Sequence, residues 1–190
     1  VKASYDVGYS EMLPNHTLER IMHEQYRAVG TVPMTEEDWA YADQMHTALP
    51  EGQEEATFRL IRFLYEEQAE TVIEQIRGKS YNTRLCPFRE IHKHKPGGTD
   101  ICDVSWYTPT VQCVVACYLK DTPGHSWQEV SQGCSSICMK GMLVAAKVMA
   151  LTGIELCTNP EALCAVREEF SQKRAGRDYV PLLPYTREDG

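Results

Sequence analysis

The sequence predicts an α/β fold in which the sheet is incomplete. Segments with apolar residues at helical spacing lie on both sides of two β-like runs, ICDVSWY at 101–107 and VQCVVACYL at 111–119. The second run is almost continuously apolar, which is typical of a strand buried on both faces. Helices that flank buried strands indicate the α/β class, but two strands are few for so many apolar helices.

Three helices are expected before residue 78. Asn15 can cap the first one. Thr35, followed three residues later by Asp38, has the pattern of a capping box and starts the second. The third contains apolar residues at helical spacing along its whole length. The predicted ranges are 15–29, 35–49 and 54–77.

Two further helices are expected after the β-like runs, while residues 79–96 are expected to form a loop with at most a short strand. A long apolar helix should span about 135–151, in which only Lys140 and Lys147 carry charge. Asn159 and Pro160 start the last helix in the preferred way, with Asn as the cap and Pro in the first turn. That helix should end at Gly176.

The composition excludes several classes of function. A net charge of −8 argues against a broad nucleic-acid surface. The sequence has no uninterrupted apolar stretch long enough to span a bilayer and opens with VKASYDVGYS, which is not a secretory signal. We therefore expect a cytoplasmic protein without a nucleic-acid or membrane partner.

Eight cysteines leave two alternatives open, a disulfide framework and reduced thiols. Most lie inside apolar runs such as VQCVVACYL, where Cys behaves as a small buried hydrophobe. The close pairs are CxxxC rather than CxxC, and residues four apart on a strand are poorly placed to share a bond or a metal. This pattern favours reduced thiols in a cytosolic protein.

His125 is the strongest candidate for a functional side chain. It lies in TPGHSW, where a Pro-Gly turn follows the second β-like run. Ligands collect at the carboxyl ends of strands in α/β sheets, and imidazole is a common metal ligand. The alternative is a structural or solvated histidine. His92 and His94 alternate on one face of IHKHK, but the neighbouring lysines would repel a metal ion.

The residues themselves supply no complete catalytic set. Adjacent glutamates, such as Glu66-Glu67, fall on predicted helices, where neighbours do not share a face. The sequence contains no His-x-Asp, nucleophile elbow, P-loop or dinucleotide fingerprint. The turn Gly97-Gly98-Thr99-Asp100 marks a place where the backbone bends sharply or is closely approached.

Taken together, three stretches resemble one family. YSEMLPNHTL, GGTDICDVSW, and TPGHSW followed by SSICMKGMLVAAKVMA are similar to the C-terminal part of the aminoacylase/glutamate-carboxypeptidase family of dinuclear zinc peptidases. The nearest branch is that of the p-aminobenzoyl-glutamate hydrolases and related amidohydrolases. One departure is CMKGM, with Cys138 and Met139, where AHKGM is expected.

The resemblance implies a division of the chain. Residues 1–13 would be the last strand of a lid or dimerisation domain that is otherwise absent. Residues 14–190 would be the C-terminal half of a zinc-peptidase-like α/β catalytic domain, with the missing strands and most of the catalytic residues in an N-terminal half. Further partners implied are a second copy, in a homodimer of the intact enzyme, and a small-molecule substrate.

The resemblance also implies site roles. His125 would be the one metal ligand that this half contributes. Gly97, Gly98, Thr99 and Asp100 would bind substrate, with Asp100 orienting neighbouring groups, although a structural role for Asp100 stays open. The intact enzyme would use two divalent metal ions, zinc or manganese, and an upstream Glu as general base.

The expected function is hydrolysis of the amide bond of an N-acyl amino acid or dipeptide, similar to p-aminobenzoyl-glutamate. The chain alone would have no catalytic residues, hold no stoichiometric metal and be inactive. One alternative is a non-catalytic binding or scaffold protein derived from the same family. A small cysteine-rich metal-binding module is a third interpretation, and it would need thiolates that converge in space.

Overall fold

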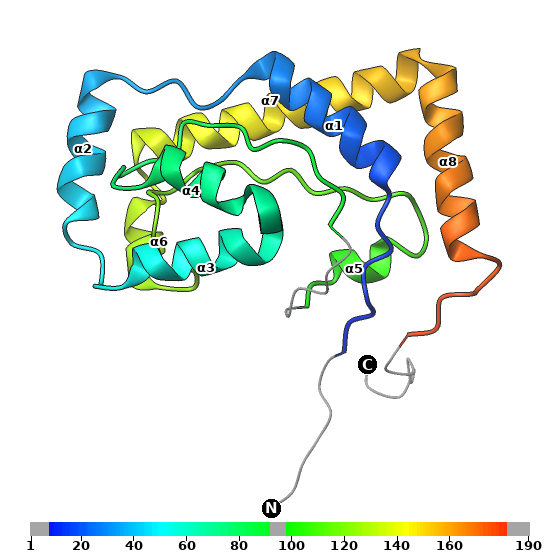
Figure 1. The fold of residues 1–190 in the computed structure, drawn as a ribbon. Helices are drawn as coiled ribbons and strands as arrows, with labels where there is room; N and C mark the ends of the chain where they lie inside the picture. The colour runs from blue at the N-terminus through cyan, green and yellow to red at the C-terminus, as the bar shows by residue number, and fades with distance from the viewer. Residues whose placement is uncertain (1–7, 92–97, 182–190) are drawn as a thin grey trace, which may run out of the picture. The chain divides into compact units, whose positions relative to one another are not determined.

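The computed structural model describes residues 8–91 and 98–181, and within these ranges the regular structure is helical, with no strand (Figure 1). The predicted α/β class with its incomplete sheet is therefore wrong for this chain. The first β-like run forms the short helix α5, Ile101–Val104. The second is extended, but none of the described segments pairs with it in a ladder. A strand needs a hydrogen-bonding neighbour, which apolar composition alone does not provide.

The chain divides into two compact units, each of which is described by itself. Unit 1 comprises residues 1–23, 94–112 and 152–190, and unit 2 comprises residues 24–93 and 113–151. Two helices, α1 (His16–Val29) and α7 (Ser136–Thr158), contribute residues to both units. The predicted boundary between residues 13 and 14 stays a prediction.

Unit 1 is organised around the start of α1 and the helix α8, Pro160–Arg174. Asn15 is buried; its Oδ1 accepts from the Leu18 N–H at 2.9 Å, and its Nδ2 donates to the Val166 carbonyl at 2.9 Å. The carboxylate of Glu169 accepts from the first backbone N–H groups of α1. The predicted Asn15 cap is thus confirmed, and α8 holds the same helix end with two further contacts.

Unit 2 contains the remaining helices and a small apolar core. The elements are α2 (Glu36–His46), α3 (Gln53–Tyr65), the 3₁₀ turn η1 (Glu66–Gln68), α4 (Ala69–Ile76) and α6 (Trp127–Gln132). Phe58, Ile73 and Ile76 form a buried cluster against which Ile61 packs. The single helix predicted over 54–77 is divided, because Glu66 adopts a φ of 46°.

The capping patterns predicted from the sequence are present in the structure. Thr35 and Asp38 form the capping box of α2, with the Thr35 side chain accepting from the Asp38 N–H. Burial alone would raise the pKa of Asp38, but hydrogen bonds from Lys140 and from Thr35 hold it below its usual value. Asn159 caps α8 by accepting from the Ala162 N–H at 3.1 Å, with Pro160 in the first turn.

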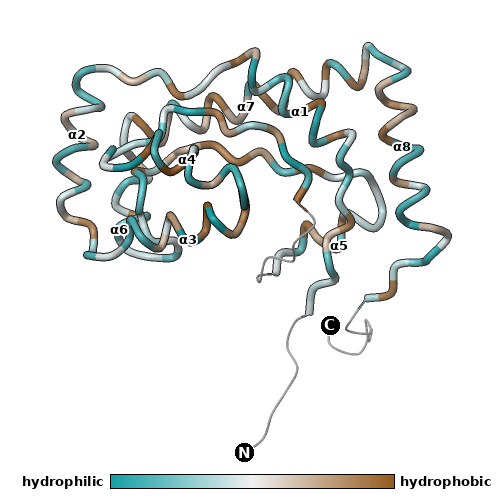
Figure 2. The backbone as a smooth tube through the Cα atoms, in the orientation of Figure 1, coloured by the Kyte–Doolittle hydropathy of each residue, from teal (hydrophilic) through white to brown (hydrophobic). Residues whose placement is uncertain are grey.

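Helix α7 is longer than predicted and consists mostly of apolar residues (Figure 2). Among the described residues it is the one helix long and apolar enough to cross a membrane by length and composition, with 28% of its most apolar window buried. Buried helices of water-soluble proteins satisfy the same criterion. In unit 2 its buried seam is Ile137, Gly141, Val144 and Val148.

Candidate functional site

His125 is presented at the surface of unit 2, on the turn that leads into α6. Its φ of 55° lies in the left-handed region, which non-glycine residues seldom adopt. The His125 N–H donates to Glu129 Oε2 at 2.7 Å, while the Glu129 N–H donates to Ser126 Oγ at 3.2 Å. These bonds stabilise both the turn and the start of α6, and no described residue hydrogen-bonds to the imidazole.

The segment before His125 is attached to α6 by the side chain of Gln132. This side chain is buried. Its Oε1 accepts from the Leu119 N–H at 2.9 Å, and its Nε2 donates to Thr122 Oγ1 at 3.0 Å. The backbone on both sides of the His125 turn is therefore held by the same short helix.

The predicted substrate turn lies in unit 1, and Gly97 falls outside the described residues, as do His92 and His94. Gly98 and Asp100 are exposed. Thr99 Oγ1 donates to Asp100 Oδ1 at 3.2 Å, so these two side chains interact with each other. A Cβ on Gly98 would lie 2.7 Å from Cδ2 of Tyr9. A glycine is therefore needed at this position because the Tyr9 ring approaches the backbone closely.

The two predicted groups of site residues thus belong to different units. The predicted roles of His125 as a metal ligand and of Gly98, Thr99 and Asp100 as substrate contacts stay predictions. His125 meets the minimum for a ligand, an exposed imidazole on a fixed turn.

A charge cluster built on the buried pair Lys120 and Asp121 directly precedes the His125 turn. Lys120 Nζ donates to Glu54 Oε1 at 2.9 Å and to the Asp121 carboxylate. His46 Nε2 lies 3.1 Å from Asp121 Oδ2, whereas Asp121 Oδ1 is buried without a partner among the described residues. A hydrogen bond from the Gly78 N–H and another from Lys120 lower the pKa of Glu54.

This cluster was not predicted from the sequence. Its one local signal is a Lys-Asp pair placed directly after an apolar run. The partners, His46 and Glu54, come from distant parts of the chain, and spacing gives no indication of them. Buried charges of this kind are costly unless they are paired, so the cluster is compatible with a structural as well as a chemical role.

A cavity of about 320 Å³ in unit 2 is lined in part by three tyrosines, Tyr26, Tyr65 and Tyr81. Burial, together with nearby thiols, raises the pKa of Tyr26 to about 12. The Tyr81 hydroxyl donates to the Ala116 carbonyl. These phenols are therefore neutral near pH 7 and can donate hydrogen bonds, but they do not provide a general base.

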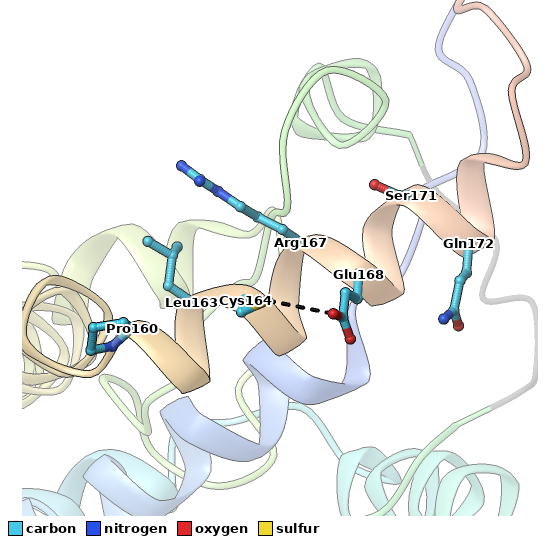
Figure 3. Close-up of a pocket in the computed structure, with 7 residues that line it drawn as sticks. All are labelled: Pro160, Leu163, Cys164, Arg167, Glu168, Ser171 and Gln172. Carbon is cyan, nitrogen blue, oxygen red and sulfur yellow. Dashed lines mark hydrogen bonds between the residues drawn. The ribbon is translucent and has the colours of Figure 1, made fainter.

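A shallow depression follows the exposed side of α8 in unit 1 (Figure 3). Leu163 and Pro160 supply apolar surface, and Cys164 Sγ donates to Glu168 Oε1 at 3.4 Å. The hydrogen bond to Glu168 raises the pKa of Cys164, which keeps the thiol protonated and unreactive. The Cys164 thiol on this surface is therefore a weak nucleophile.

Residues 8–91 and 98–181, which the structure describes, contain no group of three or more His, Cys, Asp or Glu side chains placed to hold a metal ion. All eight cysteines are free. The predicted role of His125 as a metal ligand is not tested by this finding, because it concerns groups of three or more side chains.

Comparison with known proteins identifies a curated relative. The chain is 33% identical, over 184 residues, to a subunit of p-aminobenzoyl-glutamate hydrolase from Escherichia coli (strain K12). The match covers 97% of this chain and 38% of the relative, so the chain spans little more than a third of the length of that protein. No family model and no solved structure matches. The family resemblance predicted from the sequence is confirmed.

Proposed function

We propose that this chain, as a relative of a p-aminobenzoyl-glutamate hydrolase over nearly its whole length, is the C-terminal part of a metal-dependent amidohydrolase. The intact enzyme would cleave the amide bond of an N-acyl amino acid or dipeptide similar to p-aminobenzoyl-glutamate. The relationship supports a hydrolase origin, while metal dependence and substrate belong to the proposal. The observation that carries it is the exposed imidazole of His125 on a constrained turn.

His125 would contribute one ligand to a dinuclear zinc or manganese centre. The His125 N–H is bonded to Glu129, and the segment before the turn is bonded to Gln132. The backbone that carries the imidazole therefore has little conformational freedom. When bound, the metal ions would polarise the scissile carbonyl and activate a water molecule. The other ligands and the general base would come from the part of the enzyme that this chain does not span.

The turn at Gly98-Thr99-Asp100 would bind the carboxylate of the substrate. The Thr99 hydroxyl donates to Asp100 in this structure, and it could donate to a substrate oxygen instead if that hydrogen bond were broken. Peptide N–H groups near a glycine can approach a ligand closely because no Cβ intervenes. Asp100 would orient the hydroxyl rather than touch the reacting atoms, and Gly97 is assigned to the same turn from the sequence alone.

The isolated chain should neither hydrolyse p-aminobenzoyl-glutamate nor hold zinc stoichiometrically. Measurable metal-dependent hydrolysis by these 190 residues would contradict the proposal. The sequence that the gene encodes ahead of Val1 provides a second test. A reading frame with His-x-Asp and a Glu-Glu pair supports the enzyme, whereas their absence supports the non-catalytic binding or scaffold alternative.

The decisive variant is His125→Ala in the full-length product of that gene. We expect zinc content, measured by atomic emission, to fall by about one ion per chain and hydrolysis to fall by at least about 100-fold. Val130→Ala, at an exposed position of the same helix α6, is the matched control and should leave both unchanged. Equal zinc content in His125→Ala and the parent protein would remove the assignment.

A further inference from the structure

Two thiols of unit 2 meet where the extended run at 111–119 crosses α7. A Cβ at Gly141 would lie 2.7 Å from Cys117 Sγ and 3.1 Å from Cys117 Cα, so the run approaches the helix as closely as a glycine allows. Cys138 precedes Gly141 by three positions and therefore lies on the same side of α7. The side chains of Cys117 and Cys138 hydrogen-bond to each other. The two thiols are thus neighbours in space.

This pair takes one cysteine from each CxxxC pair of the sequence. Cys113 and Cys117 belong to the extended run, whereas Cys134 and Cys138 belong to the turn before α7 and to its first turn. The spacing within each CxxxC pair disfavours a bond, but it gives no information about a bond between the two pairs. All four cysteines are free, and Cys117 and Cys138 are half-buried.

Cys138 is also a position where this chain departs from the family it resembles. The chain has CMKGM where AHKGM is expected, so Cys138 replaces an alanine. An alanine at that position would leave Cys117 without this thiol partner. The pair is therefore a property of this chain that the family resemblance does not explain.

We propose that Cys117 and Cys138 form a reversible oxidation site, which closes to a disulfide on reaction with a small-molecule disulfide such as oxidised glutathione. The Cys138 thiolate attacks one sulfur of the reagent, giving a mixed disulfide and one glutathione thiolate. The Cys117 thiolate then attacks Cys138 Sγ and displaces the second glutathione thiolate. The two protons lost by the cysteines are taken up by the two released thiolates, so the products are one protein disulfide and two glutathione thiols.

The surroundings of Cys117 favour this order of attack. Burial and the neighbouring Cys138 and Cys113 raise the pKa of Cys117, so little of it is thiolate near pH 7. A small thiolate fraction slows attack on a reagent in solution. It matters less in the second step, because the mixed disulfide on Cys138 is already held beside Cys117. Cys138 is therefore the attacking thiol and Cys117 the resolving thiol.

The disulfide would close a loop that contains the His125 turn. Residues 118–137 lie between the two cysteines and include α6. Cross-linking a loop of this length restricts the unfolded chain and should lower the equilibrium constant of unfolding in urea by at least about 30-fold. An oxidised form no more stable than the reduced form would mean that the bond does not fit the native fold, and would overturn the proposal.

Peptide mapping of the purified chain tests the bond directly. The chain is treated with oxidised glutathione or with dithiothreitol, and the remaining free thiols are then blocked with iodoacetamide. Trypsin cleaves after Lys120 and Lys140, so Cys117 and Cys138 leave in different peptides. Mass spectrometry should find these peptides joined after oxidation and separate after reduction, and fragmentation of the joined peptides would identify the bonded cysteines.

The variants separate this pair from the other thiols. Cys138→Ala and Cys117→Ser should each lower the yield of the joined peptides at least about tenfold. Cys113→Ser and Cys134→Ser, which change the other member of each CxxxC pair, are the matched controls and should retain at least about half of the yield. Circular dichroism before oxidation would show that each variant is folded.

The fold, rather than the sequence, should select the bond. In the folded chain we expect the Cys117–Cys138 bond to exceed any other pairing at least about tenfold, and in concentrated urea this preference should disappear. The proposal is overturned by cysteines that stay free in oxidised glutathione, by mixed disulfides that never close, by bonds of Cys113 or Cys134 that predominate, or by the same preference in urea. None of these measurements needs metal or substrate, so their outcome is independent of the proposed function.

Discussion

Glu169 provides a quantitative test of how unit 1 is held together. Its carboxylate accepts from the His16 and Thr17 N–H groups at 2.9 and 2.7 Å, and Lys173 Nζ lies 2.7 Å away. Burial would raise the pKa of Glu169, but the hydrogen bonds from Lys173, Thr17 and His16 lower it from 4.5 to about 2. A fall of about 2.5 in pKa corresponds to about 3 kcal/mol of stability.

This stability has a defined pH range. A depressed carboxylate pKa stabilises the folded state above the unfolded value of 4.5, and the contribution is lost as the pH falls toward 2. Glu169→Gln retains the shape but removes the charge, so we expect a loss of about 2–3 kcal/mol at pH 7. Urea titrations of both proteins between pH 7 and pH 2.5 would measure the difference.

The matched control is Glu168→Gln at the next, exposed position of α8, which should change the free energy of unfolding by less than about 0.5 kcal/mol. A difference between the parent protein and Glu169→Gln that stays constant from pH 7 to pH 2.5 would refute the electrostatic reasoning. A loss below about 1 kcal/mol at pH 7 would show that α8 does not hold the start of α1 in this way.

Two further predictions concern unit 2 and α7. Gly141→Ala should destabilise the chain by about 1–3 kcal/mol, because the new Cβ would meet Cys117. Gly153→Ala on the same helix would meet nothing within 4 Å and should stabilise the chain by about 0.5–1 kcal/mol. Thermal unfolding compares the two variants, and equal effects would contradict the packing at Gly141. Lys120→Met leaves the Asp121 carboxylate buried beside His46 and should lower the free energy of unfolding, measured in urea, by about 3 kcal/mol. The control Lys79→Met, at an exposed position, should lower it by less than about 0.5 kcal/mol. A loss for Lys120→Met as small as that of the control would show that the pair of Lys120 and Asp121 is not needed for stability.

The parts of the fold that depend on neighbours in the sequence were predictable. The caps at Asn15, Thr35 and Asn159 follow from the chemistry of a side-chain oxygen beside free N–H groups, and each is present. The ranges of α1, α2 and α8 agree with the prediction within a few residues. Local signals of this kind are independent of the rest of the molecule.

The predictions that failed required information from elsewhere in the molecule. The run at 111–119 has the composition of a buried strand, but a strand exists only where another segment offers matching N–H and C=O groups. The run at 101–107 is short enough for either conformation, and hydrogen bonds such as that from the Ser105 N–H to the Ile101 carbonyl favour the helix.

The candidate site was predictable only in part, for the same reason. His125 could be selected as a candidate because the Pro-Gly turn and the end of an apolar run are local features, and its role stays a prediction. The pairing of Lys120 with Glu54 joins residues 66 positions apart, and no local pattern announces it. The further metal ligands that the proposed function requires would belong to a part of the proposed enzyme that this chain does not span.

The buried amide of Gln132 affects the metal-ligand role that is proposed for His125. By joining Leu119 and Thr122 to α6, it lowers the conformational entropy of the loop in the absence of any ion. Coordination would then order few additional bonds, and the affinity contributed by one imidazole would approach that of a preorganised ligand. A shorter or apolar side chain at position 132 would return this entropy to the free state and weaken binding without altering a single coordinating atom.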